Sequence, residues 1–306
     1  MKIAVVMAGH LRTWNYNKEL IIKGLDTLIP GKKDWYVCYW ESTTSTDYEI
    51  AKFIENSGHN IIKVRSVKHT ASPLKNFYIP WCTNLTRASL QVCTLYYLKN
   101  IIDFDKRKYE FSNNIKYDIT YNIRPDVVYA LDNKSTTLLS MILNDKFENF
   151  PLQIMGDYVI NSNSATVAAT SVDDLLQMTG YFSSDILGLT YLNFNRYHGV
   201  FQKGTIRGGH CTHAILPHYL FSHGVHSRYL DHLHRDRHIF VSPKLTRPNI
   251  DYDKLVFELN NWDGFHYRYH FWNYEYENLW ISYSDEKKKE ICVQKGIDPR
   301  DYYLET

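Results

Sequence analysis

Apolar residues in the first part of the chain occur in two patterns, continuous runs and helically spaced positions. Residues 2–8 are almost all apolar, which is typical of a strand buried on both faces. Residues 14–28 and 48–57 have helical spacing, and each segment ends at a glycine or proline. Further strands are predicted at 35–40 and 60–67. This β-α-β-α-β order predicts a parallel sheet with helices packed against it.

The rest of the chain continues the alternation of helices and strands less regularly. The predicted elements are a long amphipathic helix, a strand, a helix capped by Ser171 and a helix ended by Gly224, at residues 85–102, 117–123, 171–181 and 213–223 respectively. Two short apolar segments, 152–155 and 159–160, flank Gly156-Asp157. No internal repeat or low-complexity linker interrupts the chain.

Composition describes a folded chain without a global charge bias. The 306 residues are 44% hydrophobic and 22% charged, which is too apolar for a disordered chain. The length fits one large domain or two smaller ones. A formal net charge of +2 gives no overall electrostatic reason to bind nucleic acid or a membrane. The net charge does not exclude a local basic groove.

Cysteine usage and the first residues predict an intracellular protein. The five cysteines are widely spaced and form no CxxC pair, which favours a reducing compartment. The first apolar run is too short for a signal peptide, and no segment is long enough to span a membrane. The 25 tyrosines, with many Asn, Lys and Ile, are typical of an AT-rich genome such as that of a phage or virus. We therefore expect a cytoplasmic protein, in the host cytoplasm if the chain is viral.

Polar residues follow several predicted strands directly. Gly9, His10 and Arg12 come after the first strand, Glu41 after the second, and Arg124-Pro125-Asp126 after a later one. In open α/β sheets, ligands bind beyond the carboxyl ends of the strands. The joint placement of these residues therefore predicts a ligand site at that edge.

The chemistry of these residues suits a nucleotide diphosphate. Gly9 allows a ligand to approach the backbone closely, and Arg12 and Arg124 offer paired donors for phosphate. Asp126 can hold a divalent cation that bridges a diphosphate. The first strand–helix turn has neither GxGxxG nor GxxxxGK[ST], which argues against a dinucleotide fold and a P-loop. A plainer alternative is that Arg124 and Asp126 pair with each other.

Five segments, in order along the chain, carry a family resemblance: "KIAVVMAGHLRTW", "DWYVCYWES", "NLTRASLQVCTLYYLKN", "YDITYNIRPDVVYAL" and "GDYVINSNSATV". They resemble small GT-A-type nucleotide-sugar glycosyltransferases of bacterial polysaccharide clusters, phages and large viruses. The resemblance covers residues 1–240. It implies a GT-A-like (Rossmann-like) α/β fold, with a mixed, mainly parallel sheet and helices on both faces. Residues 241–306 form a separate aromatic-rich segment that we expect to pack on this domain.

The resemblance also implies roles for individual residues. It places the donor against the first strand ends and the middle helix, at Ala8, Gly9, His10, Arg12, Glu41, Arg87, Gln91 and Asp126. Asp126 corresponds to the acidic position of a DxD-like metal site that would hold Mn²⁺ or Mg²⁺. This chain departs from the pattern, because Val127 and Val128 follow Asp126 with no second acid. A single-carboxylate cation site and a metal-free site in which Arg124 supplies the charge both stay open.

A general base is needed near the acceptor hydroxyl in an inverting transfer. Asp157 is the candidate, because it interrupts an apolar stretch beside a glycine. The alternative is a turn aspartate that bonds its own backbone. Where relatives often have a glutamate before the late helix, this chain has His210-Cys211-Thr212-His213, so a histidine base is a further option.

The last third of the chain is rich in histidines and aromatic rings. Nine of the 14 histidines lie between His198 and His238, but no HExxH or cysteine pair supports a zinc site. The segment 262–280 has many rings, which stack on sugars and on bases. We expect most of them to pack on the domain and Trp262, Tyr267 and Tyr269 to contact the acceptor.

The sequence therefore predicts a hexosyl- or pentosyltransferase with a nucleotide-sugar donor, with UDP favoured as its nucleotide. Arg124 stabilises the leaving diphosphate, and Asp157 is the base. The acceptor is a glycan or a hydroxymethylated base, 5-hydroxymethylcytosine, in phage DNA, and the sequence does not separate the two. A non-catalytic nucleotide- or sugar-binding module is the alternative from another class. A zinc hydrolase built on the histidines is a more distant one.

Overall fold

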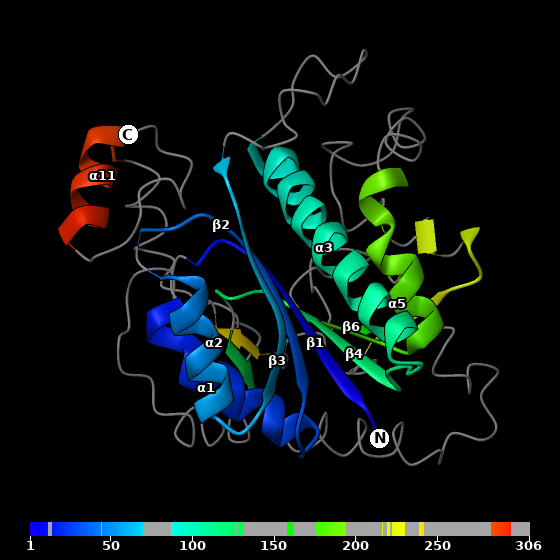
Figure 1. Cartoon of the computed structure of the whole chain (residues 1–306). Coiled ribbons are helices and arrows are strands. Elements are labelled where there is room, and N and C mark those ends of the chain that lie inside the picture. The colour runs from blue at the N-terminus through cyan, green and yellow to red at the C-terminus, as the bar shows by residue number, and fades with distance from the viewer. Residues whose placement is uncertain are drawn as a thin grey trace, which may run out of the picture.

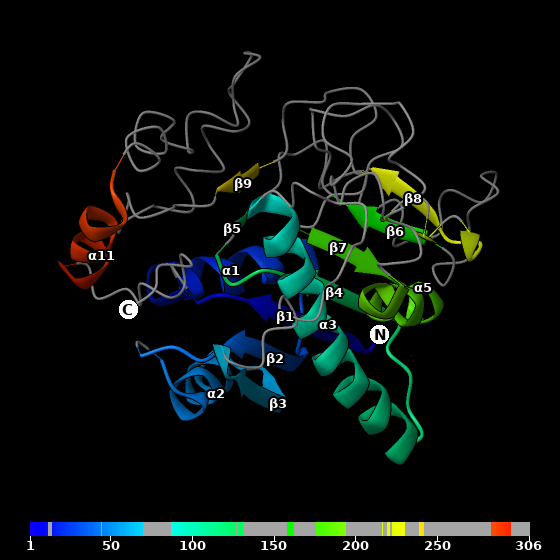
Figure 2. The same ribbon diagram turned by 90° about the horizontal axis from the view of Figure 1, so that it is seen from above.

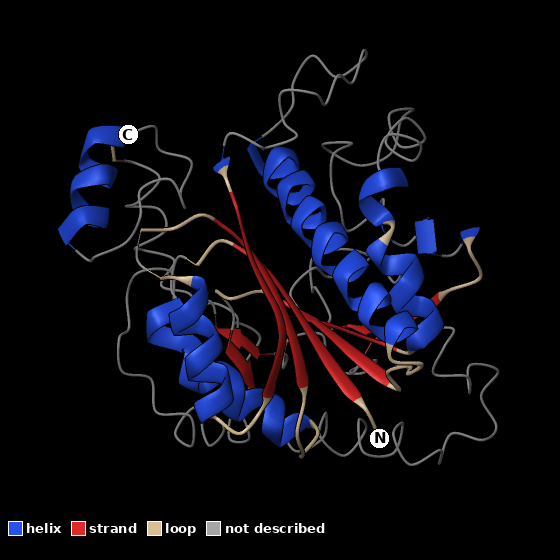
Figure 3. Cartoon of the chain, viewed as in Figure 1, coloured by secondary structure: helices blue, strands red, loops and turns tan. Residues whose placement is uncertain are grey.

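The larger part of the structure is one seven-stranded sheet with helices on both faces (Figures 1 and 3). The computed structural model describes residues 1–11, 14–43, 45–69, 87–126, 128–130, 158–161, 176–193, 216, 219–220, 222–229, 239–241 and 283–294. The strands of this sheet are β1 (Ile3–Gly9), β2 (Asp34–Trp40), β3 (Asn60–Val67), β4 (Ile119–Ile123), β6 (Tyr158–Asn161), β7 (Leu176–Thr179) and β8 (His226–Tyr229).

Five helices and a small second sheet complete the long elements of the described residues. The helices are α1 (Trp14–Leu28), α2 (Asp47–Asn56), α3 (Arg87–Ser112), α5 (Tyr181–Gly188) and α11 (Asp285–Gln294). The second sheet pairs β5 (Val128–Ala130) with β9 (Ile239–Val241) in antiparallel fashion. No helix in the described part of the chain is long and apolar enough to cross a membrane.

The strands of the larger sheet lie in the order β3-β2-β1-β4-β7-β6-β8, which Figure 2 shows from above. The first four in this order are parallel to one another. β7 runs antiparallel to both of its neighbours, β4 and β6, whereas β6 and β8 are parallel. The prediction of a mixed, mainly parallel sheet with helices on both faces is confirmed.

β1 is buried on both faces because its side chains alternate between two apolar cores. Val5 packs with α1 and α2, and Val6 packs with α3 on the opposite face. Every residue of β1 is buried. The continuous apolar run at the start of the sequence thus reflects a central strand that is covered on both sides.

The predicted elements of the first seventy residues are confirmed closely. The helix at 14–28 and the strand at 60–67 have the predicted bounds, and β2 and α2 each begin one residue earlier than predicted. Thr46 begins α2 through a capping box: its hydroxyl accepts from the backbone N–H of Glu49, whose carboxylate accepts from the backbone N–H of Thr46.

The middle helix is longer than predicted, because α3 continues past Ile102 to Ser112. The added turns bury charged residues rather than apolar ones. Asp103 accepts from Arg107 at 2.8 Å, and Lys106 pairs with Glu110 at 3.2 Å. These (i, i+4) pairs are helix-compatible, but they leave no apolar periodicity for the sequence pattern to show.

The predicted helix at 171–181 is wrong for its described part. Residues 176–179 form strand β7, and the helix α5 starts only at Tyr181. Gln177 and Thr179 face Asn122 and Thr120 of β4 across the sheet. The residue pattern of so short a segment is compatible with both a helix and a strand. Pairing with β4 makes it a strand. The predicted N-cap, Ser171, lies outside the described residues.

Several other predictions fall wholly or partly outside the described residues. These are the segments at 152–157, 213–215 and 262–280. The described residues of the predicted helix 213–223 are helical up to Ser222, and Gly224 then takes a positive φ of 74°. The division at residue 240 stays a prediction.

His59 gives the fold a specific pH dependence. The side chain is 4% exposed, both ring nitrogens lack a hydrogen-bond partner, and Nε2 lies 3.5 Å from Asp26 Oδ1. Burial lowers the pKa of His59, and Lys33 adds to this, while Asp26 opposes it. The folded state therefore binds the proton less well than the unfolded chain, whose histidines titrate near about 6.5.

We expect the free energy of unfolding to decrease as the pH falls below about 6.5, down to the lowered pKa of the folded state. His59→Gln removes this titrating group, so urea unfolding at several pH values should show a smaller acid loss for the variant than for the wild type. An identical pH dependence in both proteins would contradict this assignment.

Candidate functional site

The carboxyl ends of four parallel strands meet at one edge of the sheet. Trp40 pairs with Val67, Gly9 with Tyr39, and Met7 with Ile123. The residues that follow β1, β2, β3 and β4 are therefore neighbours, although they are far apart in the sequence. This is the edge at which open α/β sheets bind ligands, and the sequence predicted that polar groups gather there.

Gly9 ends β1 in a conformation that favours glycine, with a φ of +141°. A Cβ atom at this position would lie 3.1 Å from Pro125 Cδ and 3.9 Å from Leu95 Cδ1. The prolyl ring after β4 thus packs directly on the end of β1. The glycine is required by the close approach of two strand ends as well as by its backbone angle.

Five aromatic rings form a continuous row at this edge, which we call the edge stack: His10, His69, Trp40, Tyr97 and Tyr191. Trp40 stacks on His69 with ring centroids 5.7 Å apart and on Tyr97 at 6.1 Å. His10 lies 5.9 Å from His69 and 6.2 Å from Trp40. Tyr191 meets Tyr97 edge to face at 5.2 Å. The row joins the ends of β1, β2 and β3 to α3 and the segment after α5.

The edge stack is partly accessible. Trp40 and His10 are buried, whereas His69, Tyr97 and Tyr191 are half-buried. His69 Nε2 lies 3.0 Å from the carbonyl oxygen of Glu41, whose own N–H donates to Val67 O at 2.8 Å. The side chain of Glu41, a predicted donor-binding residue, is exposed, and the backbone carbonyl of Glu41 is the group that contacts His69. Such rings can stack on a base or on the C–H face of a sugar.

Arg124 and Asp126 pair with each other after β4. Arg124 Nε donates to one carboxylate oxygen of Asp126 at 2.9 Å, and an Nη donates to the other at 2.8 Å. Asp126 is 4% exposed. Arg124 and Asp126 therefore pair with each other, as the plainer alternative in the sequence analysis predicts. The two hydrogen bonds also hold the guanidinium plane in one orientation at the strand edge.

A cation site of protein ligands alone is not formed by the described residues. Among them, no group of three or more His, Cys, Asp or Glu side chains is placed to hold a metal ion. Asp126 offers one carboxylate, and that carboxylate already accepts from Arg124. A cation at Asp126 would therefore need ligands from a bound donor or from other parts of the chain.

A row of buried polar side chains lies between α3 and the strands β4 and β7. Lys99 donates to Gln177 Oε1 at 3.2 Å, and Gln177 Nε2 donates to the hydroxyl of Tyr96 at 3.3 Å. The Lys99 ammonium lies 5.1 Å from the centre of the Tyr96 ring. Asn122, opposite Gln177, is one residue before the end of β4. The polar row thus reaches toward the strand edge from inside the domain.

The structure shows where only some of the predicted site residues lie. It brings Gly9, His10, Glu41, Arg124 and Asp126 to one edge. The side chain of Ala8 is fully buried against α3, so this residue can offer only its backbone to a ligand. Several predicted residues lie outside the described residues, namely Arg12, Asp157, Trp262, Tyr267, Tyr269, His210 and His213. Arg87 and Gln91 are in the first turns of α3, and their side chains are not described.

Sequence reasoning missed four members of the edge stack: Trp40, which was read as the end of a strand, and His69, Tyr97 and Tyr191. His69 had a usable signal, because it follows the third predicted strand as His10 follows the first. Tyr97 and Tyr191 had none, since a tyrosine on a helix is ordinarily read as packing. Gln177 was missed because its segment was predicted to be helical.

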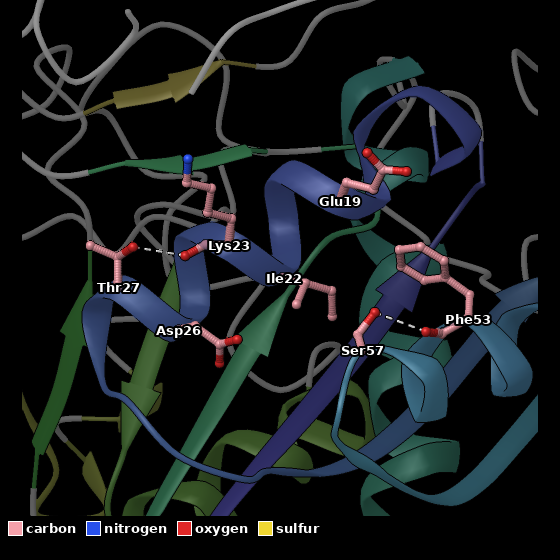
Figure 4. A pocket seen from close by; sticks show the side chains of 7 residues that line it. All are labelled: Glu19, Ile22, Lys23, Asp26, Thr27, Phe53 and Ser57. Atoms are coloured by element: carbon pink, nitrogen blue, oxygen red, sulfur yellow. Dashed lines mark hydrogen bonds between the residues drawn. The ribbon is translucent and has the colours of Figure 1, made fainter. Parts of the chain in front are cut away.

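An open surface pocket of about 470 Å³ lies between α1 and α2 (Figure 4). Two of its hydroxyl groups bond locally, Thr27 to Lys23 O at 2.8 Å and Ser57 to Phe53 O at 2.9 Å. None of the predicted site residues lines it; the lining residues are Glu19, Ile22, Lys23, Asp26, Thr27, Phe53 and Ser57. It belongs to the helical layer, and we assign no function to it.

Comparison with known proteins finds similarity in structure alone. No protein-family profile and no curated protein matches the chain. The apo form of the glycosyltransferase GlyE of Streptococcus pneumoniae TIGR4 is similar over 74% of this chain and 45% of its own, with 13% identity and a TM-score of 0.38. The chain thus spans less than half of GlyE.

A galactosyltransferase, LgtC, in complex with donor and acceptor sugar analogues, is similar over 73% of this chain and 72% of its own, with 13% identity and a TM-score of 0.38. Both scores are low, so no residue's role in this chain rests on either likeness.

The packing of Gly9 predicts a difference between two glycines. Gly9→Ala and Gly31→Ala both place an alanine at a positive φ, +141° and +115°. Only Gly9 has a neighbour in the way, since nothing lies within 4 Å of a Cβ at Gly31. Backbone strain costs on the order of 1–3 kcal/mol, and we expect Gly9→Ala to lower the free energy of unfolding further than Gly31→Ala. Equal losses in urea unfolding would show that Pro125 yields without cost.

Proposed function

We propose that the protein is a glycosyltransferase that moves a sugar from a nucleotide-sugar donor to a hydroxyl group. The observation that carries this proposal is the edge at which the edge stack and the Arg124–Asp126 pair occur together, beyond the carboxyl ends of β3, β2, β1 and β4. A nucleotide diphosphate is bound by rings that stack on its base and by a cationic side chain that pairs with its phosphates, and this edge offers both. The ordered sequence motifs, which resemble GT-A-type glycosyltransferases, support the same assignment.

The donor's base would stack on the edge stack, against the accessible rings His69 and Tyr97. The diphosphate would pass over the end of β1, where Gly9 has no side chain to keep it from the backbone. His10, between these two places, would contact the base or its ribose. We favour a UDP-sugar, and the family resemblance adds Arg12, Arg87 and Gln91 as donor contacts.

Arg124 would stabilise the charge that develops on the leaving diphosphate. A guanidinium has five N–H donors, and Asp126 takes two of them at 2.8 and 2.9 Å, so the same group can also meet a phosphate oxygen. Asp126 then acts by keeping the guanidinium in place. If a Mn²⁺ or Mg²⁺ ion is used, Asp126 would be its protein ligand, and the ion would neutralise diphosphate charge.

The acceptor hydroxyl would attack the anomeric carbon as the bond to the diphosphate oxygen breaks. In an inverting transfer, the proton of that hydroxyl passes to a base, and Asp157 is the candidate for that role. Trp262, Tyr267 and Tyr269 are the candidates to hold the acceptor. We propose a glycan acceptor, because a base inside duplex DNA would have to be flipped out, and a net charge of +2 gives little attraction to DNA.

The class of reaction is tested by incubating the protein with UDP-, GDP-, dTDP- and CMP-sugars, with and without manganese, and measuring the nucleotide released. We expect release from a UDP-sugar. His69→Ala should weaken UDP binding by about 1–3 kcal/mol, the usual contribution of base stacking on a ring. His223→Ala, at another half-buried histidine away from the edge, is the matched control. Nucleotide binding without turnover of any donor, with any acceptor, would favour the binding-module alternative.

Substitutions in the Arg124–Asp126 pair distinguish the two proposed roles of Asp126, which are to orient Arg124 and to hold a cation. Arg124→Gln should lower turnover about 10²–10³-fold, as expected for losing a group that stabilises developing charge. If Asp126 holds a cation, Asp126→Asn abolishes the stimulation by manganese, while Arg124→Gln retains it. If Asp126 only orients Arg124, both variants lose turnover similarly and manganese has no effect in the wild type. Full activity of Arg124→Gln would remove Arg124 from the mechanism.

A further inference from the structure

Exposed apolar side chains gather at one corner of the domain. Eight large hydrophobic residues are exposed in the described part of the chain, and five of them lie on α3, on α5 or at the amino terminus beside them. We call these five the aromatic corner: Met1, Phe104, Phe111, Tyr181 and Phe182. Phe111 is 90% exposed and Phe104 is 70% exposed. Apolar surface that is scattered singly needs no explanation, but a cluster of this kind marks an interaction site.

The aromatic corner forms from neighbouring elements. Phe104 and Phe111 are two helical turns apart and so lie on one side of α3, with the exposed Lys108 one turn from each. The middle of α5 lies beside this part of α3, because Arg107 Nε is 3.3 Å from Asp185 Oδ1. Figures 1 and 2 both place the amino terminus close to α5.

Lysines border the exposed rings. Lys116 Nζ lies 4.4 Å from the centre of the Tyr181 ring. Lys2 is bound to the residue two positions after Lys116, since the Asp118 N–H donates to Lys2 O at 2.9 Å. Lys2, Lys108 and Lys116 are all exposed. The exposed acidic residue at the same place is Asp118, whose carboxylate accepts from the backbone N–H of Lys2 at 2.6 Å. Asp103, Glu110 and Asp185 also lie there, and each is paired with Lys106 or Arg107. The exposed charges that border the rings are therefore mainly positive.

We propose that the aromatic corner docks the protein on the surface of an anionic membrane. Phenylalanine and tyrosine rings enter the interface between headgroups and acyl chains, and lysines beside them meet anionic headgroups. A second copy of the chain fits less well, because a symmetric contact would bring the same positively charged patch against itself.

Docking in this way leaves the candidate site accessible. α3 begins at the strand edge that carries the edge stack and runs away from it (Figure 1). Phe104 and Phe111 are in the second half of that helix. The contact is therefore made at a distance from the edge stack, and it does not depend on the proposed glycosyltransferase activity.

The test is co-sedimentation of the full chain with lipid vesicles. One set contains phosphatidylcholine alone, and the other contains equal parts of phosphatidylcholine and phosphatidylglycerol. We expect binding to the anionic vesicles only, weakened by salt because screening reduces the lysine contribution. The double variants Phe104→Ser/Phe111→Ser and Lys108→Glu/Lys116→Glu should each reduce the bound fraction several-fold.

Tyr48→Ser is the matched control, because Tyr48 is also 70% exposed but lies on α2. It should bind as the wild type does. Circular dichroism confirms that each variant is folded, and nucleotide release is followed separately. Absence of wild-type binding, equal binding to neutral vesicles, or undiminished binding of both double variants would overturn the proposal. Light scattering that shows a wild-type dimer, lost in Phe104→Ser/Phe111→Ser without vesicle binding, would assign the corner to a second copy instead.

Discussion

Parallel pairing of β1 with its two neighbours is the constraint on which the rest of the structure depends. Because β1 hydrogen-bonds to β2 on one side and to β4 on the other, with all three strands in the same direction, their carboxyl ends are forced to one edge. Parallel pairing also requires a long crossover between strands, and α1 and α3 are such crossovers. Because these crossover helices cover both faces of the sheet, the edge formed by the carboxyl ends of the strands is the place where polar side chains can contact a ligand.

The strand ends approach one another so closely at that edge that only particular residues are compatible with it. Pro125 packs on the end of β1, so Gly9 has no room for a side chain. Asp126 is buried and is stabilised by two hydrogen bonds from Arg124, since a buried carboxylate without a partner would be strongly destabilising. The charged pair after β4 is thus a part of the fold and, in the proposed function, the part that meets the diphosphate.

The helix α3 joins the separate regions of the molecule. Its first half carries Tyr97 of the edge stack and Lys99 of the buried polar row, and its second half carries the exposed rings Phe104 and Phe111. Between these, Asp103 occupies the space beside Gly188 of α5, where a Cβ would lie 1.9 Å from a carboxylate oxygen. α5 can approach α3 this closely only because Gly188 has no side chain. α3 thus carries residues of both the edge stack and the aromatic corner on one continuous helix.

The sequence by itself determined the elements whose burial follows a simple period. β1, α1, β2, α2 and β3 show as apolar runs and helical spacing, because each packs an apolar face on the core, and the polar residues that follow the strands predict the edge. Only the tertiary structure decided the rest. Pairing with β4 makes 176–179 a strand, buried ion pairs extend α3 to Ser112, and the edge stack gathers rings from five segments. These features depend on contacts between residues distant in sequence, and such contacts leave no local period to read.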